Sequence, residues 1–412
     1  MGLISRSRRT LAEEGASSTA WRVGNYLATR RNPFRSVPLS TVYTDDVVAV
    51  DWSEPHDFNS GATPPRPGGQ RVAWIITPPG RTSGGHQNAF RFVEFLEKAG
   101  YLLTVYLYAP QQYPKFSIAG VRRMMSETNA YPELRADFVR YDPTTGIVGE
   151  FDAIMASDWE NSYAAYRYQG AAKRFYFIQD FEPAFFPAGS DYLLAENSYR
   201  LGLHGFSAGP WLARKVREDY GMSADHYEYS VDVTSYHRTN TASRNEVLFY
   251  ARPPTPRRAT EFGLLALREL HRRRPDVTIN LVGWDMSDYQ VPFPYVNHGG
   301  VDISKLNDIY NRCAAGLILS LTNMSLLPLE VMASGVVPIV NEGDNTHGFF
   351  DTDAFEYVPT APAAIAQRII DVLDRPDQAE HSARIAQSMA KTSWADPGAT
   401  FVAQFRAAMD GV

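Results

Sequence analysis

The 412-residue chain contains a single cysteine, Cys313. One cysteine excludes an intramolecular disulfide framework and a zinc cage of thiolates, and it suits a reducing cytoplasm. No run of about 18 apolar residues occurs, so the sequence predicts no membrane-spanning helix. The start of the chain, residues 1–9, carries positive charge without a following apolar stretch of signal-peptide length, so we expect no secretion signal.

Several catalytic motifs are also missing. The nine histidines include no pair at i, i+4, the helical spacing of two metal ligands, so we expect no catalytic metal. No G-x-S-x-G motif supports a serine hydrolase. The segment 80–85 lacks the G-x-G-x-x-G spacing of a dinucleotide site, and no acidic residue ends the strand expected at 102–108.

The charge and size of the chain narrow its class. A net charge of -6 argues against a general nucleic-acid binder, and 412 residues with 44% hydrophobic content suffice for two domains. Residues 1–70 differ from the rest of the chain. Before residue 40, arginines outnumber acidic residues, and apolar residues could line one side of a helix. That segment either rests on anionic lipid or packs on the main body, and residues 51–69 are expected to form a connecting loop.

From residue 71 onward, strand and helix patterns alternate, which is typical of a mostly parallel sheet covered on both faces. The first unit is expected to contain a helix through 89–96 and strands at 72–77, 102–107, 153–156, 174–178 and 204–207. After a polar linker the pattern restarts, with strands at 246–251, 278–283 and 316–321 and helices at 261–273, 306–313, 361–373 and 394–409. We therefore expect an α/β protein with domains at 71–235 and 236–392, a linker at 232–244 and a ligand cleft between the domains.

Residues 321–340 indicate a loop, a helix capped by Ser325 and a buried strand. Glu330 is the one charged residue on this otherwise apolar helix. The N–H groups of Ser325, Leu326 and Leu327 are expected to face an anion, and Glu330 to accept hydrogen bonds from vicinal hydroxyls. A diphosphate and a ribose would meet both requirements. The alternative is a core helix whose Glu330 pairs with an arginine or a lysine.

Two arginines follow the first strand of the second unit, in the string Ala-Arg-Pro-Pro-Thr-Pro-Arg-Arg that ends at residue 258. The guanidinium groups of Arg252 and Arg257 match the oxygens of a diphosphate, although a solvated basic turn is the alternative. In the first unit, Gly84 and Gly85 stand between a strand and a helix, so the backbone there can approach a ligand closely. Paired glycines in turns are common, so Gly84 and Gly85 alone are weak evidence of ligand contact.

Polar residues also follow the strand at 174–178. Gln179, Asp180 and Glu182 are expected at its carboxyl end, where carboxylates orient sugar hydroxyls or take up an acceptor proton. For Asp180, capping of the next element is an equal alternative. Phe181 offers an apolar face to a sugar ring, with a place in the core as the alternative.

From residue 71 to the C-terminus these residues resemble the retaining GT-B-fold glycosyltransferases, specifically glycosyltransferase family 4 and its relatives in bacterial surface-glycan assembly. Gly84 and Gly85 match the family's first-domain loop at the donor site. Arg252 matches the family's arginine that holds the donor diphosphate, and Arg257 stands where the family has a lysine five positions later.

The resemblance continues in the second unit. Thr322 and Glu330 stand at the positions of the family's two glutamates separated by seven residues, and residues 329–340 resemble its Leu-Glu-Ala-Met-Ala-Ser-Gly run. Ser393 and Trp394 match its closing Ser-Trp motif. The resemblance implies the GT-B fold, with two doubly wound Rossmann-like domains and a last helix, 393–412, that crosses back to the first domain.

Three departures bear on the donor sugar. Thr322 replaces a glutamate that touches the donor sugar in the family, Gln179 stands where many members have histidine, and Arg257 replaces lysine. Altered sugar contacts beside a retained diphosphate motif indicate an uncommon donor. The string Tyr-Ala-Arg-Pro at 250–253 is similar to rhamnosyltransferases of cell-surface glycan synthesis.

The resemblance therefore implies metal-independent, retaining transfer of L-rhamnose from dTDP-L-rhamnose to a hydroxyl of a glycan or lipid-linked glycan. The roles it implies are catalysis for Arg252, Arg257 and Asp180, donor binding for Gly84, Gly85, Thr322, Asn323, Ser325, Leu326, Leu327 and Glu330, and acceptor binding for Gln179, Phe181 and Glu182. We expect no cofactor beyond the nucleotide sugar, no nucleic-acid partner and a cytoplasmic location, with peripheral membrane contact through residues 1–70 as an option. The alternatives are a nucleotide-sugar epimerase of the same fold and a non-catalytic sugar-nucleotide sensor.

Overall fold

The computed structural model describes residues 42–411, apart from 55, 65, 82, 111–114, 349 and 351–353. The basic part of the N-terminal extension, with its two alternative roles, lies outside the described residues. None of the helices in the described part is long and apolar enough to cross a bilayer.

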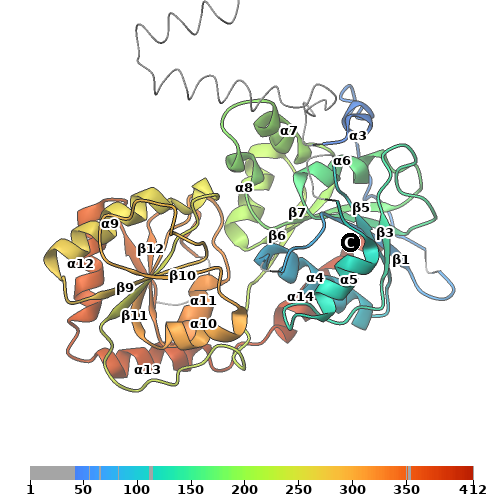
Figure 1. Cartoon of the computed structure of the whole chain (residues 1–412). Coiled ribbons are helices and arrows are strands. Elements are labelled where there is room, and N and C mark those ends of the chain that lie inside the picture. Colours follow the sequence, from blue (N-terminus) through green and yellow to red (C-terminus); the bar gives the residue numbers. More distant parts are fainter. Residues whose placement is uncertain are drawn as a thin grey trace, which may run out of the picture. The chain divides into compact units, whose positions relative to one another are not determined.

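The first sheet has seven strands, all parallel, in the order β3-β2-β1-β4-β5-β6-β7 (Figure 1). Its strands are β1 Arg71–Ile76, β2 Leu102–Leu107, β3 Asp137–Arg140, β4 Ala153–Ala156, β5 Lys173–Ile178, β6 His204–Ala208 and β7 Ala224–Tyr227. Side chains alternate between its two faces: Val72 and Trp74 belong to one buried cluster and Ala73 to another. Both faces are therefore covered, as expected for parallel strands with helical crossovers.

The second sheet has six parallel strands in the order β10-β9-β8-β11-β12-β13. Its strands are β8 Glu246–Tyr250, β9 Thr278–Val282, β10 Val296–Gly299, β11 Cys313–Ile318, β12 Val337–Asn341 and β13 Glu356–Val358. Figure 1 shows α9 and α12 on one side of this sheet and α10 and α11 on the other. We call each sheet with its helices the first and the second domain.

Apart from α3, which precedes β1, the helices connect successive parallel strands or follow the last of them. Those of the first domain are α3 Thr44–Val48, α4 Gly84–Lys98, α5 Ile118–Ser126, α6 Trp159–Arg167, α7 Ser190–Ser198 and α8 Pro210–Tyr220, with a short 3₁₀ turn, η1 Glu182–Phe185. Those of the second are α9 Thr260–Arg273, α10 Ile303–Tyr310, α11 Leu327–Ala333, α12 Pro362–Leu373 and α13 Gln378–Met389, with η2 Pro256–Arg258. The expected α/β class with two parallel-sheet domains is confirmed.

The last helix, α14 Ala395–Asp410, returns to the first domain, as expected. Phe401 packs against Phe92 of α4 with 4.9 Å between ring centroids. Gly398 lets the helix come close, because a Cβ at this position would lie 2.7 Å from the ring of Phe95. The C-terminal residues therefore complete the core of the domain that the chain builds first.

Two predicted elements end earlier in the chain than expected, namely the helix at 306–313 and the strand at 316–321, which is β11, Cys313–Ile318. The helix expected at 306–313 ends at Tyr310, and Cys313 already begins β11. All six residues of β11 are buried, and such a short apolar run does not by itself distinguish a strand from a buried helix. The polar linker has no helix or strand, but its last residue, Arg244, is buried and donates hydrogen bonds to the carbonyl oxygens of Cys313 and Ser334, both at 3.0 Å.

Candidate functional site

The first predicted site residues follow β1. Gly84 and Gly85 form the first turn of α4, and neither has a positive φ. A Cβ at Gly84 would meet none of the described residues within 4 Å, and at Gly85 the nearest atom would be Nε2 of Gln179, at an ordinary 3.6 Å. Neither backbone conformation nor packing within the described chain requires glycine here. Two adjacent glycines at this turn instead leave room for something outside the chain.

Asp180, just after β5, joins the two domains. Its Oδ2 accepts a hydrogen bond from Nε of Arg257 at 2.9 Å. Its Oδ1 accepts from the backbone N–H of Asn323 at 2.8 Å and from that of Phe181 at 2.9 Å. A carboxylate with both oxygens engaged in this way orients its partners. This geometry favours positioning over uptake of a proton, and Asp180 does not cap the next element, because η1 has no side-chain cap.

Asp180 and an aromatic ring fix Arg257. Its guanidinium carbon lies 3.8 Å from the centroid of the Phe185 ring. Within the described chain only Nε of this arginine has a hydrogen-bond partner, which leaves both terminal nitrogens for the two oxygens of a phosphate. Arg252 lies at the end of β8, where its Nη1 donates to the hydroxyl of Tyr250 at 3.0 Å.

A hydrogen-bonded loop after β11 carries the next predicted residues. Ser320 Oγ donates to the carbonyl oxygen of Asn323 at 2.7 Å and accepts from Nη1 of the buried Arg258 at 2.9 Å. The side-chain amide of Asn323 donates to the backbone oxygens of Gln179 at 3.2 Å and Ala208 at 2.8 Å, both in the first domain. The sequence reading treated Arg258 only as the end of a basic string. The structure shows that it braces this loop.

Thr322 is the exception in the loop. Its side chain is 2% exposed, and its hydroxyl has no hydrogen-bond partner among the described residues. An unpaired buried hydroxyl costs about 1–3 kcal/mol. This hydroxyl is therefore a polar group that a ligand could satisfy.

The start of α11 differs from the sequence expectation. The helix begins at Leu327, its N-cap is Leu326, and no side chain caps it, so the prediction of a Ser325 cap was wrong. Leu326 has helical backbone angles, φ -66° and ψ -22°. The predicted binding of an anion by the N–H groups of Ser325, Leu326 and Leu327 stays a prediction.

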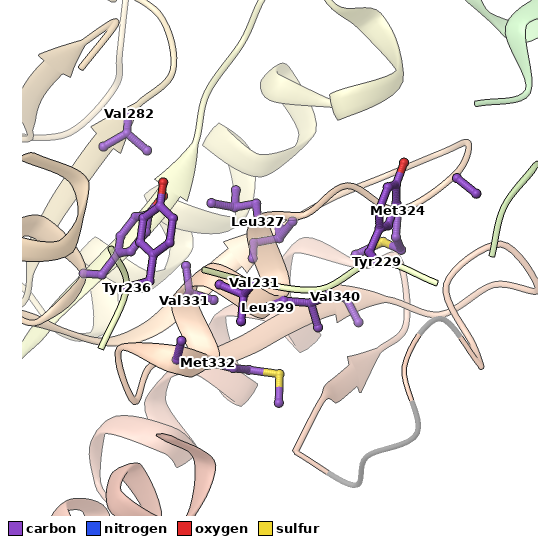
Figure 2. Close-up of a cluster of buried hydrophobic side chains, with 14 of the residues drawn as sticks. Tyr229, Val231, Tyr236, Val282, Met324, Leu327, Leu329, Val331, Met332 and Val340 are labelled. Atoms are coloured by element: carbon purple, nitrogen blue, oxygen red, sulfur yellow. The ribbon is translucent and has the colours of Figure 1, made fainter. Parts of the chain in front are cut away.

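Glu330 lies on α11 among apolar neighbours. Figure 2 shows Leu329 and Val331, the residues on either side of it, within the buried cluster that also contains Tyr229, Val231 and Tyr236. Burial raises the pKa of Glu330 to about 7, and this rise is opposed by the charge of Arg91 and a hydrogen bond from Tyr310. That hydrogen bond is long, 3.5 Å between the Tyr310 hydroxyl and Oε2. The carboxylate therefore has hydrogen-bonding capacity to spare.

Arg91 of α4 is a residue that the sequence reading missed. Its guanidinium carbon lies 4.0 Å from the centroid of the Trp394 ring, and its Nη1 is buried without a partner among the described residues. Burial lowers the pKa of Arg91, while the negative charges of Glu330 and Asp232 raise it. Helical spacing could have identified Arg91, because residues 84, 88 and 91 share one face of a helix. On that face, Asn88 donates to Oε1 of Gln179 at 3.1 Å.

Glu182, one of the predicted acceptor residues, has its side chain engaged within the first domain. Glu182 Oε2 accepts from the backbone N–H of Trp159 and from the hydroxyl of Tyr176, both at 2.6 Å. Burial, with further contributions from neighbouring carboxylates, raises its pKa well above the ordinary value. Phe181 stacks on Tyr199 at 6.0 Å between centroids. Glu182 thus supports the first domain from within, which corrects the expectation that it faces an acceptor. Phe181 is half-buried, and its contact with an acceptor stays a prediction.

No three His, Cys, Asp or Glu side chains in the described ranges are placed to hold a metal ion. The sequence does contain one Asp-x-Asp triplet, residues 351–353, which falls outside those ranges. Metal independence stays a prediction.

Comparison with known proteins gives one family match and a distant relative. Residues 245–370 match the family described as the C-terminal domain of WsaF. The O-antigen biosynthesis protein RfbC of Myxococcus xanthus is 28% identical over 337 residues, which cover 79% of this chain and 26% of that protein. The chain thus spans about a quarter of the length of this curated relative.

Solved structures are similar at low sequence identity. Sucrose-phosphate synthase from Thermosynechococcus elongatus has a TM-score of 0.60 at 12% identity, over 82% of this chain and 98% of that one. TarM has a TM-score of 0.62 at 8% identity, with the same coverage of 82% and 98%. A glycosyltransferase from Rickettsia africae has a TM-score of 0.58 at 12% identity, over 84% and 100%. The two parallel-sheet domains and these likenesses together show that the chain has the GT-B fold.

Proposed function

We propose that this protein is a glycosyltransferase that moves a sugar from a nucleoside diphosphate onto a hydroxyl of a bacterial surface glycan. The observation that carries the proposal is the meeting of residues from both domains at Asp180, which contacts Arg257 and Asn323. The GT-B fold and the distant relative named for O-antigen biosynthesis support it.

The proposed chemistry uses the arginines as fixed positive charges. Arg257, together with Arg252 from the chain after β8, would hold the diphosphate and stabilise the charge that develops as it departs. The acceptor oxygen forms a bond to the anomeric carbon, the bond from that carbon to the diphosphate oxygen breaks, and the acceptor proton passes to the departing phosphate oxygen. Attack on the same face retains the configuration, and the step requires no metal.

Glu330 is proposed to hold the pentose of the nucleotide. Its carboxylate has one long hydrogen bond and accepts from a sugar hydroxyl when it is ionised. A deoxyribose offers only its 3′-hydroxyl, so a dTDP-linked donor would use one hydrogen bond here. We assign Asn323 and Thr322 to the same proposed donor site as Gln179, Gly84 and Gly85.

Thr322 supports an uncommon, neutral donor sugar, for which we propose L-rhamnose. The family that the chain resembles has a carboxylate at this position, and here a buried hydroxyl without a partner takes its place. A sugar without a 6-hydroxyl needs fewer charged contacts, which suits a threonine and the neutral Gln179.

The direct test is a thermal-shift screen of the full chain with dTDP-L-rhamnose, UDP-glucose and GDP-mannose, followed by product analysis. A bound ligand raises the melting temperature in proportion to the logarithm of its concentration over Kd. We expect the largest shift with dTDP-L-rhamnose, and transfer only when a glycan is added. Conversion of the donor sugar without a glycan would indicate an epimerase instead, and tight binding without turnover on any glycan would indicate a sensor.

Thr322→Val should weaken the preference for the cognate donor. The change keeps the shape of the side chain and removes its hydroxyl. A hydrogen bond to the cognate sugar, worth about 1 kcal/mol, is then lost, so kcat/KM should fall roughly fivefold with that donor only. Ser325→Ala, in the same loop, is the control because Ser325 does not cap α11. Equal kcat/KM for Thr322→Val and the unmodified protein with every donor would remove Thr322 from the sugar site.

A further inference from the structure

A cavity of about 380 Å³ lies in the first domain, away from the residues discussed so far. Tyr43 lines it from the segment before the first strand, and Ala109 lines it from the chain after β2. Arg140, Tyr141 and Asp142, at the end of β3, complete most of its wall. The proposed reaction uses none of these residues.

The topology places this cavity on the same edge of the sheet as the donor residues. All seven strands of the first sheet are parallel, so their carboxyl ends share one edge. Gly84 and Gly85 follow β1, and β2 and β3 are the next two strands outward. With a strand spacing of about 4.8 Å, β3 lies roughly 10 Å from β1, a distance that a short oligosaccharide covers.

A buried network holds the aromatic wall in place. Asp46, which is fully buried, accepts hydrogen bonds from the hydroxyls of Tyr141 at 2.6 Å and Tyr108 at 3.3 Å and from Nη1 of Arg167 at 2.9 Å. The hydroxyl of Tyr43 donates to the carbonyl oxygen of Ala109 at 2.6 Å. The rings of Tyr43 and Tyr141 both pack on that of Tyr108, each at 5.0 Å between centroids. A wall fixed in this way loses little side-chain entropy when a ligand binds.

The polar groups at the rim carry both signs of charge. Arg140 is exposed, and its guanidinium lies 3.9 Å from the ring of Phe116. The exposed Asp142 uses Oδ1 to accept from the backbone and hydroxyl of Thr144, at 2.9 Å and 2.7 Å. A guanidinium next to a carboxylate disfavours a phosphate and suits hydroxyls, which donate to one group and accept from the other. Aromatic faces beside them suit the apolar C–H faces of a sugar ring.

We propose that this cavity binds one sugar ring of the acceptor glycan, at a distance from the hydroxyl that receives the new sugar. The inference rests on the proposed function and specifies it further, because it makes the acceptor an oligosaccharide that extends along the edge of the first sheet. It also gives a role to Tyr43, which precedes the part of the chain that resembles glycosyltransferases.

The test compares two exposed arginines that both stack on phenylalanine. Arg140 lines the cavity, whereas Arg122, 5.1 Å from the ring of Phe138, does not. The full chain is applied to an array of bacterial oligosaccharides of one to five sugars. We expect Arg140→Gln to weaken binding of the longer glycans about tenfold, as loss of a charged hydrogen bond implies, and Arg122→Gln to leave binding unchanged.

Further readouts separate this inference from the proposed function. Binding of monosaccharides and the thermal shift by dTDP-L-rhamnose should stay the same in Arg140→Gln. Tyr43→Ala, checked for folding by its melting temperature, should give the same selective loss. Equal binding of long glycans by Arg140→Gln and the unmodified chain, or no glycan binding by the unmodified chain, overturns the cavity proposal. Absence of transfer with every donor and glycan, despite normal binding of long glycans, instead counts against the proposed function alone.

Discussion

Replacing Glu330 by glutamine is expected to abolish binding of the nucleotide sugar and, at pH 8, to make the protein more resistant to heat. Burial raises the pKa of Glu330 from 4.5 to about 7. Between these values the folded state binds more protons than the unfolded state, so stability falls as pH rises from 4.5 to 7, and above 7 the full cost of the buried charge is present. Glutamine removes that charge.

The measurement is a set of thermal melts of both proteins at pH 5 and pH 8, with calorimetric titration of the donor at pH 8. The gain in melting temperature should be largest at pH 8 and much smaller at pH 5. Glu342→Gln, an exposed carboxylate of the same domain, is the control and should change neither quantity. Normal donor affinity in Glu330→Gln would remove this residue from the donor site.

Donor affinity itself should depend on pH through the same group. The unmodified protein is expected to lose affinity as pH falls through about 7, because the protonated carboxyl accepts hydrogen bonds less well. Arg91 opposes the rise in the pKa of Glu330, so Arg91→Met should move the midpoint to higher pH, and Arg91→Lys, which keeps the charge, should move it less. Identical affinity profiles for the three proteins would show that Arg91 does not act on Glu330.

Arg257→Ala is expected to lower kcat by about 10²–10³-fold, the usual effect of losing one group that stabilises developing charge. Asp180→Asn should lower kcat less, because the arginine remains but loses the carboxylate that orients its Nε. Arg257→Lys should recover part of the loss, since it restores charge without the planar fork.

Steady-state kinetics with the donor at saturation measure this prediction. Arg268→Ala, which removes an exposed arginine on α9 of the same domain, is the control and should retain full kcat. If Arg257→Ala raised KM with kcat unchanged, the arginine would bind the ground state and the transition state equally, and its catalytic role would be wrong.

Continuous apolar runs made much of the fold predictable. β2 and β4 occupy the predicted residues 102–107 and 153–156 because buried parallel strands consist of such runs. β3, Asp137–Arg140, was not predicted because it is an edge strand with only one buried residue. Sequence order also placed Glu182 correctly after β5, but the 3₁₀ turn η1 buries its side chain, which no spacing rule indicates.

Pairings across the two domains were beyond prediction from spacing. Asp180 and Arg257 are 77 residues apart, and only the folded sheets bring them to hydrogen-bonding distance. Both residues were chosen as site candidates for their chemistry, but their contact with each other was not foreseen. Arg91 was missed because the prediction of α4 rested on its apolar positions, and Arg91 lies among its polar ones.

The return of α14 to α4 determines when the first domain can finish folding during synthesis. This domain lacks the rings of Phe401 and Phe405 until α14 has been translated, although its seven strands emerge well before the second domain is made. Its nascent form therefore exposes apolar surface on α4 and β5 while about 170 further residues are translated, at roughly 5–20 residues per second. Chaperone dependence should accordingly be concentrated in the first domain.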